Sequence, residues 1–225
     1  MFGSKGISGS TIKIIAMISM LVDHTAIVFV KGNPELYTMM RQWIGRMAFP
    51  IFCYLLVEGF LHTGNRFKYA GRLFLFALIS EIPMDMALYG GFPDWKHQNV
   101  LFTLLLGLLM LWGMELTQQK LKNVWMQWLA QGILFAAAAL LAQVTYCSYQ
   151  WKGIFAIAAL YLFRKIKSEQ IIAGCIAFCW EPTALLAFAP IAFYNGKRGL
   201  KLKYIFYLFY PAHLIMLYLL ALRFQ

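Results

Sequence analysis

Charged side chains are scarce in this chain of 225 residues, where Asp, Glu, Lys and Arg together make up 13%. An ordinary soluble domain carries about twice that share. Hydrophobic residues reach 61%, and the mean hydropathy is +0.65. Because a fold of this size must expose part of its surface, it could not keep so much apolar area away from water. The shortage of charge therefore excludes a soluble globular protein, a disordered chain and a disulfide scaffold.

Cysteine is sparse as well, and its four copies form neither a CxxC pair nor a zinc-ligand pattern. Cys175 and Cys179 lie four residues apart in an apolar run, so they share a helix face and are interpreted as packing residues. No metal site is predicted. The first apolar run is not followed by a small-residue cleavage site, which indicates a retained helix and not a removed signal peptide.

Acidic residues are rarer than basic ones: nine Asp and Glu stand against 20 Lys and Arg, which gives a net charge of +11. In a soluble protein this excess would suggest nucleic acid. Here the basic residues stand in short breaks between apolar runs, which favours a role in fixing topology and contacting anionic lipid. We therefore expect the lipid bilayer as a partner, and no nucleic acid.

Apolar runs dominate what is present. Dividing the chain at its charges and turn residues gives the segments 12–30, 43–61, 70–89, 98–116, 124–143, 146–163, 169–180, 182–195 and 203–222. Most have the roughly 20 residues that a membrane span requires. Segments 169–180 and 182–195 are shorter, so they are either tilted spans or a re-entrant hairpin. The pattern predicts an all-α, polytopic transmembrane helical bundle of about nine spans, or seven plus a re-entrant hairpin at 169–195. It forms a single integral membrane domain over residues 1–225.

The distribution of basic residues predicts the orientation. With the N-terminus inside, 14 Lys and Arg fall on the cytoplasmic side and 6 on the opposite side. This asymmetry favours a cytoplasmic N-terminus and an external C-terminus.

Ionisable residues inside spans are expensive, so each is a functional candidate. Four of them, from four different spans, reach a similar depth: His24, His213, Glu81 and Glu58. Counting about 1.5 Å per residue from the nearest cytoplasmic charge places all four about 12–16 Å deep, near the middle of a hydrocarbon core about 30 Å thick. Asp23 shares that level, and Asp85 lies further out. A common depth predicts one internal polar cavity.

Asp23 and His24 are the most informative pair of candidates, because two ionisable residues stand next to each other inside one span. Neighbours on a helix point about 100° apart, so each must find a partner on another span. His24 is either a general base or a structural histidine bonded across a helix interface.

Other polar groups leave two interpretations open. Glu81 and Asp85 lie four residues apart and could orient a histidine, bind a cation or share a proton, or could pair with arginines between helices. Arg46, at the outer end of the second span, either snorkels or pairs with Asp23. The dipeptide Gln98-Asn99 opens the fourth span, where it either binds substrate or caps the helix.

The chain resembles the TraX family of membrane acetyltransferases over nearly its whole length. The resemblance rests on the order and spacing of Leu21-Val22-Asp23-His24, the run 44–52 continuing to 58–63, Arg72, Ser80-Glu81-Ile82-Pro83 with Asp85, Gln98-Asn99-Val100, the run 204–207, and Tyr210-Pro211-Ala212-His213. One departure lies at residues 148–153, where the family tends to show an Asp-Tyr-Gly type of turn.

The resemblance implies a relation to the acyltransferase-three and heparan-glucosaminide acetyltransferase group. That group carries acetyl from cytosolic acetyl-CoA to an acceptor across the membrane. It implies that His24 acts as the base or as an acetyl carrier, and that Lys13, eleven positions earlier, stands where the group has a basic residue. Other roles follow by the same resemblance: catalytic support for Asp23, Glu81 and His213, and substrate or donor binding for Arg46, Asn99, Asp85, Glu58 and Gln98.

The implied acceptor is a peptide N-terminus, a sugar or a lipid-linked hydroxyl or amine. The implied location is the bacterial cytoplasmic (inner) membrane, and relatives are compatible with a homodimer. Two rivals predict similar polar groups: a small-solute transporter or flippase, and a structural partner of a secretion or conjugation machine.

Overall fold

Backbone groups inside a bilayer must find their hydrogen bonds within the protein, and helices achieve this locally. The computed structural model describes residues 6–200 and 203–224. Its α-helices are α1 (Gly9–Phe29), α2 (Pro34–Thr38), α3 (Ala48–His62), α4 (Arg66–Met84), α5 (Val100–Lys120), α6 (Val124–Val144), α7 (Gln150–Leu162), α8 (Lys167–Ala177), α9 (Phe188–Ala192) and α10 (Lys203–Phe224). Four shorter helical segments lie between them: η1 (Met39–Ile44), η2 (Gly45–Met47), η3 (Asp85–Tyr89) and η4 (Pro182–Ala187).

Over the described residues, five helical stretches are long and apolar enough to cross a membrane: Gly9–Phe29, Pro34–His62, Val100–Lys120, Val124–Val144 and Tyr204–Phe224. The expected all-helical, multi-pass architecture is thus confirmed. The exact number of spans and the side of the N-terminus stay predictions.

Residues 167–192 fold as two short arms. α8 has 11 residues, so it is about 16 Å long, roughly half of the hydrocarbon thickness. The chain returns through η4 and α9. At the base of the two arms, Nζ of Lys167 donates to the carbonyl oxygens of Ala192 and Tyr194, at 2.7 and 2.6 Å. The short lengths of α8 and of the returning η4–α9 arm favour the re-entrant hairpin over two full spans.

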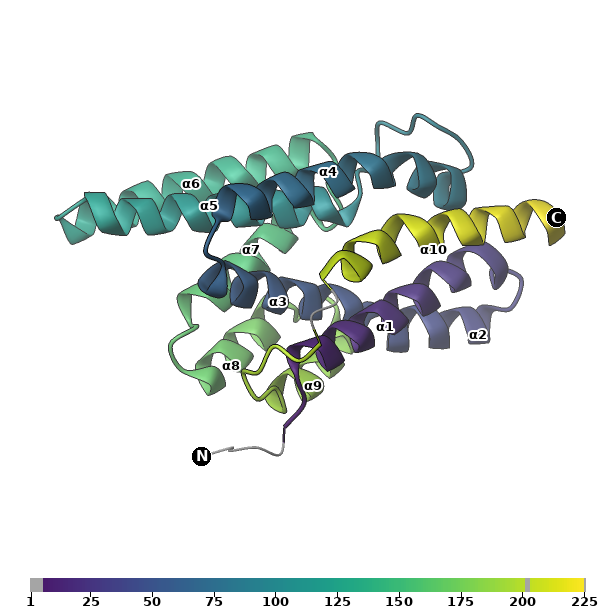
Figure 1. Ribbon diagram of the computed structural model, residues 1–225, viewed down its shortest axis with the longest axis horizontal. Helices are drawn as coiled ribbons and strands as arrows, with labels where there is room; N and C mark the ends of the chain where they lie inside the picture. Colours follow the sequence, from purple (N-terminus) through teal and green to yellow (C-terminus); the bar gives the residue numbers. More distant parts are fainter. Residues whose placement is uncertain (1–5, 201–202, 225) are drawn as a thin grey trace.

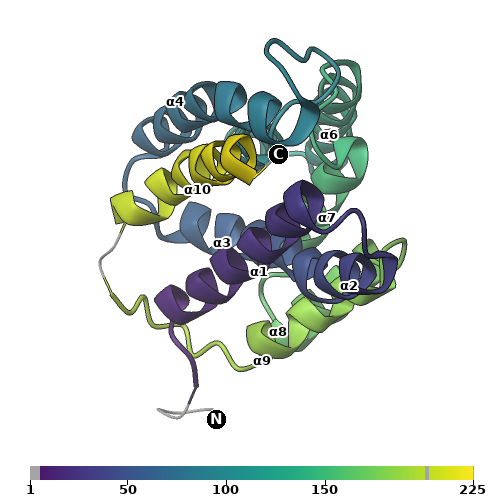
Figure 2. The same ribbon diagram turned by 90° about the vertical axis from the view of Figure 1, so that its right-hand side faces the viewer.

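The first and last long helices lie side by side. α1 and α10 run in the same direction, and α10 also packs against α4 (Figure 1). The end view in Figure 2 shows the same neighbours, with α3 inside the bundle. α3 contacts α1, α5 and α7, and its Ile51, Cys53 and Val57 are fully buried. Residues 189 positions apart in sequence, His24 and His213, therefore face each other between α1 and α10.

Between α2 and α3 the helix changes its winding, and this irregular stretch faces α1. η1 is a π-helix and η2 a 3₁₀-helix, a local change that is frequent at functional sites. Oγ of Ser19 donates to the carbonyl oxygen of Gly45 at 3.1 Å, and also contacts that of Ile44 at 2.5 Å. A Cβ atom at Gly45 would lie 2.5 Å from Oδ1 of Asp23, so only glycine allows this close approach.

Candidate functional site

Two histidines from opposite ends of the chain form the centre of the candidate site. Nδ1 of His24 on α1 lies 2.7 Å from Nε2 of His213 on α10. The two rings are nearly parallel, with an angle of 6° between their planes. The prediction that His24 finds its partner on another span is confirmed.

Hydrogen bonding assigns the tautomers of this pair when both rings are neutral. Nδ1 of His213 lies 2.7 Å from the carbonyl oxygen of Phe209. A carbonyl only accepts, so this nitrogen carries the proton, and Nε2 of His213 is an acceptor. Nδ1 of His24 must then donate to it. It follows that Nε2 of His24 keeps a free lone pair.

Two ion pairs connect the neighbouring helices. Oδ1 of Asp23 lies 3.8 Å from Nε of Arg41 in η1. Nε of Arg46 in η2 lies 3.4 Å from Oε2 of Glu181, at the tip of the hairpin. Asp23 therefore has its partner on another helix, as predicted, but that partner is Arg41. Of the two interpretations of Arg46, pairing is observed: its salt-bridge partner is Glu181, and the charge of Asp23 also acts on it.

A cavity of about 630 Å³ lies beside the histidine pair. Its polar lining includes Asp23, His24, Arg41, Arg46 and Gln98. The cavity brings α1 and η1–η2 together with the segments that lead into α5 and α7. It therefore presents a histidine, a carboxylate and two guanidinium groups to the same space.

Glu81 and Asn99 are hydrogen-bonded to each other, and neither lines the cavity. The backbone N–H and the Nδ2 amide of Asn99 both donate to Oε1 of Glu81, at 2.8 and 2.6 Å. Oδ1 of Asn99 accepts from the backbone N–H of Leu101 at 3.0 Å, which caps the start of α5. Capping, one of the two interpretations of this dipeptide, is thus observed for Asn99, whereas Gln98 lines the cavity.

Asp85 closes the loop that follows α4. Its Oδ2 accepts from the backbone N–H of Asp94 at 2.8 Å. Outside the spans, Nδ1 of His97 and the backbone N–H of Lys96 donate to the Asp94 carboxylate, and these bonds lower the pKa of Asp94. Asp85 and Asp94 together order the loop that forms one wall of the cavity.

Two other candidates lie away from the cavity. Glu58 faces Tyr194, His62 and Lys167 near the base of the hairpin. Nζ of Lys13 lies 5.1 Å from the centroid of the Phe206 ring. The prediction of one shared cavity was therefore wrong for Glu58 and Glu81, because equal depth does not place side chains on the same side of the bundle.

A family model described as "TraX protein" matches residues 8–221. The chain belongs to the TraX family. It is 30% identical to a protein of Dichelobacter nodosus named "Probable fimbrial assembly protein FimC, serogroup H1", over 93% of this chain and 94% of the relative. No solved structure matches the chain significantly. The family, identified first by resemblance, is confirmed over nearly the full length.

The TraX match includes both histidines and the η1–η2 segment between α2 and α3. Sequence reasoning missed the part that Glu181 plays and did not single out Tyr149 or Trp180, which line the cavity. Glu181 carried a signal, because it is the lone acidic residue between two apolar runs that are each too short to span. In the described part of this TraX-family chain, no group of three or more His, Cys, Asp or Glu side chains could hold a metal ion.

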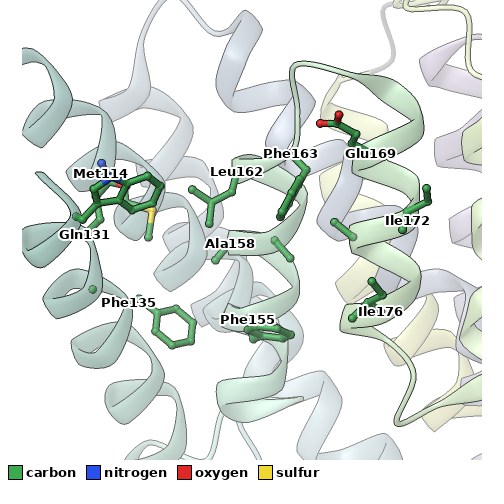
Figure 3. Close-up of a pocket in the computed structure, with 14 residues that line it drawn as sticks. Met114, Gln131, Phe135, Phe155, Ala158, Leu162, Phe163, Glu169, Ile172 and Ile176 are labelled. Carbon is green, nitrogen blue, oxygen red and sulfur yellow. The ribbon is translucent and has the colours of Figure 1, made fainter. Parts of the chain in front are cut away.

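A second concavity lies between α6 and α8, over the outer face of α7 (Figure 3). It measures about 590 Å³, and its lining is almost wholly apolar, with Phe135, Phe155 and Ile176 among it. Gln131 and Glu169 are its polar members. This groove offers no histidine and no cation, so the polar cavity beside His24 is the candidate functional site of the TraX-family chain.

Proposed function

We propose that this TraX-family chain is a membrane-embedded acetyltransferase that moves acetyl from cytosolic acetyl-CoA to an acceptor amine or hydroxyl. The observation that carries the proposal is the free lone pair on Nε2 of His24. The Phe209 carbonyl and His213 direct the proton of neutral His24 to Nδ1, and His24 lines a polar cavity. A base held in one tautomer inside such a cavity is suited to remove a proton from an attacking nucleophile.

The proposed reaction is a direct acyl transfer. As the acceptor nitrogen or oxygen bonds to the thioester carbonyl carbon, its proton passes to Nε2 of His24. Arg41 or Arg46 stabilises the oxyanion of the tetrahedral intermediate, and Gln98 is a further donor in the cavity. When the carbon–sulfur bond breaks, the proton on His24 passes to the departing thiolate of CoA. Asp23, close to the new imidazolium, offsets its charge.

A variant of this route passes acetyl through His24 itself. There, Nε2 attacks the thioester carbonyl carbon and CoA leaves as its thiolate. The acceptor then attacks the acetyl-imidazolium, its proton passes to the CoA thiolate, and neutral His24 is restored. Both routes use the same lone pair and need the same tautomer. They differ in whether labelled acetyl stays on the protein when no acceptor is supplied.

The acceptor we favour is an amine or hydroxyl of a cell-surface component. The relative in Dichelobacter nodosus carries the name of a fimbrial assembly protein, which supports a peptide of a surface filament. Sugars and lipid-linked hydroxyls are the other acceptors that the resemblance implies. The protein would act in the bacterial cytoplasmic membrane, with the basic residues at the predicted cytoplasmic side attracting the polyanionic CoA.

The test is incubation of detergent-purified protein with radiolabelled acetyl-CoA, with and without candidate acceptors. We expect release of CoA and label on the acceptor, both lost in His24→Gln. The matched control is His62→Gln, the same change at a histidine at the end of α3. If the folded protein neither binds acetyl-CoA nor releases CoA, the proposal fails. Movement of an unmodified solute would then select a transporter, and intact filament assembly in His24→Gln a structural role.

A further inference from the structure

The apolar groove between α6 and α8 contains a buried polar side chain without a partner. Gln131 on α6 is only 6% exposed, and it lines the groove. Its amide makes no hydrogen bond to any of residues 6–200 and 203–224. Buried amides are nearly always hydrogen-bonded, and a bilayer offers little water to one that is not. Gln131 therefore indicates a ligand that brings polar atoms into the groove.

The polar members of the groove lie toward one end, and its aromatic and branched side chains lie toward the other (Figure 3). Gln131 is seven residues from the start of α6, which is about 10 Å along the axis. Glu169 is two residues from the start of α8, which is about 3 Å. Phe135, Phe155 and Ile176 line the opposite end. A groove that is polar near the membrane surface and apolar toward its centre has the polarity of a lipid molecule.

Two exposed tryptophans place the membrane interface on α6. Trp125 is 79% exposed and Trp128 is 59% exposed, and Trp128 also lines the groove. Tryptophan is enriched at the level of the lipid headgroups. Gln131 follows Trp128 by three residues, about 5 Å along the axis, and the interfacial layer is about 5–8 Å thick on each side. The amide therefore lies at the inner edge of that layer, where the glycerol esters join the acyl chains of a lipid.

The size of the groove fits acyl chains better than it fits a helix. The groove measures about 590 Å³. A helix about 10 Å across would occupy about 1,300 Å³ over a length of about 16 Å, that of α8. Two acyl chains, each roughly 5 Å across, occupy about 600 Å³ over the same length. Short side chains provide the room, because Ala158 and Ala159 line the groove on α7 and a Cβ atom at Gly132 would meet nothing within 4 Å.

The charge at the polar end selects the headgroup. The Glu169 carboxylate has no hydrogen bond or ion pair within the described part of the chain. Among the described residues that line the groove there is no Lys or Arg. A carboxylate in this position repels an anionic headgroup and forms a charge-assisted hydrogen bond with an ammonium group. This end of the groove therefore favours a lipid that carries an amine.

We infer that the groove binds one diacyl aminophospholipid of the adjacent leaflet, which is the cytoplasmic one in the predicted orientation. Its chains lie along α7 between α6 and α8, a glycerol ester carbonyl accepts from Nε2 of Gln131, and its ammonium group donates to Glu169. α7 contacts both α6 and α8, and the lipid adds a second link between them. It would thereby brace the hairpin whose tip carries Glu181, the partner of Arg46. The inference goes beyond the proposed function and does not depend on it.

Binding is measured in the absence of acetyl-CoA. Delipidated protein in detergent receives increasing mole fractions of dioleoylphosphatidylethanolamine, thermal unfolding is followed, and native mass spectrometry counts the bound lipid. We expect one bound lipid per chain and a saturable rise of several degrees in the unfolding temperature. Dioleoylphosphatidylglycerol has the same chains but an anionic headgroup without an amine, so it should bind about tenfold more weakly.

Two nearly isosteric variants separate the contributions of the headgroup and the ester. Glu169→Gln should lower the affinity for the amine lipid about tenfold, to the level of the anionic one, whereas Gln131→Leu should lower both affinities about threefold, because both lipids carry the ester. The matched controls are Glu35→Gln at the start of α2 and Gln143→Leu at the other end of α6, which should leave both affinities unchanged. Unfolding temperatures without lipid establish that each variant is folded. Glu169→Gln should keep the wild-type value there, since its carboxylate has no protein partner.

The inference fails under any of three outcomes. Equal affinity of the wild type for both lipids would mean that the headgroup is not recognised. A preference for the amine lipid that persists in Glu169→Gln would mean that this carboxylate does not select it. Efficient disulfide-linked dimers of a Gly132→Cys chain that also carries Cys179→Ser, formed in native membranes, would place a second copy of the chain in the groove.

Discussion

Replacing His213 tests the tautomer argument directly. His213→Ala removes the acceptor for the Nδ1 proton of His24, which lies 2.7 Å from it. An unsatisfied buried N–H costs about 1–3 kcal/mol, equivalent to about 5- to 150-fold in rate. That penalty is relieved when the ring places its proton on Nε2, the nitrogen that the reaction needs free. We therefore expect kcat for acetyl transfer to fall by about this factor.

His24→Ala should have the larger effect. General-base catalysis contributes about 10²- to 10⁴-fold, and His24→Ala removes the base itself. Because His213 acts through His24, the double variant should be no slower than His24→Ala alone. His213→Gln supplies a side-chain oxygen that accepts from Nδ1, so it should recover most of the rate that His213→Ala loses. The rate of CoA release in single-turnover reactions is measured for each of these four variants.

Three results would refute this reasoning. One is an unchanged kcat in His213→Ala. Another is a double variant whose loss equals the product of the two single losses, which would mean independent roles. The third is a His213→Gln enzyme as slow as His213→Ala, which would show that His213 carries protons and does not only position His24. Equal unfolding temperatures would establish that the comparison concerns folded proteins.

Three further predictions concern the supports of the site, and a fourth concerns the orientation of the chain in the membrane. Glu181→Gln leaves the charge of Arg46 without its partner, so the unfolding temperature in detergent should fall by several degrees while Glu169→Gln, on the other side of α8, leaves it unchanged. Gly45→Ala should lower both stability and activity, because its Cβ would meet Asp23 at 2.5 Å; equal stability of this variant would contradict the close approach. Asn99→Ala should destabilise the protein by about 0.5–2 kcal/mol through the lost cap, and Asn99→Ser should restore part of it. Cysteines placed at Gly91 and Asn123 in a chain without its own exposed thiols should react with an impermeant reagent from opposite sides, and labelling of Asn123→Cys from outside the cell would reverse the predicted orientation.

Much of the architecture follows from hydropathy alone. Long apolar runs must be helical in a bilayer, and charge positions along each run set the depth of its polar groups. Depth was sufficient to relate His24 to His213, because their two helices are neighbours. It failed for Glu58 and Glu81, because depth contains no information on which face of which helix a residue occupies.

Local signals were decisive where the partner lies nearby in sequence. Asn99 stands immediately before the first residue of α5, and its capping role is a property of that position. The partners of Asp23 and Arg46 depended instead on the π- and 3₁₀-turns of residues 39–47, which shift the register of both arginines. The amino-acid composition of a segment does not predict such turns. The partners within 4 Å, Arg41 for Asp23 and Glu181 for Arg46, were therefore not predicted from the sequence.

The hairpin of α8, η4 and α9 has a consequence for biogenesis. Its arms are too short to be recognised by the insertion machinery as independent spans, and its tip carries Glu181. An acidic residue at the centre of an inserting helix costs about 2.5–3.5 kcal/mol on the translocon scale. Arg46, the salt-bridge partner of Glu181, is synthesised before the hairpin, in a segment that packs against α1. We expect the hairpin to enter the membrane after the preceding helices have assembled, so that the polar cavity beside His24 closes only when the chain is nearly complete.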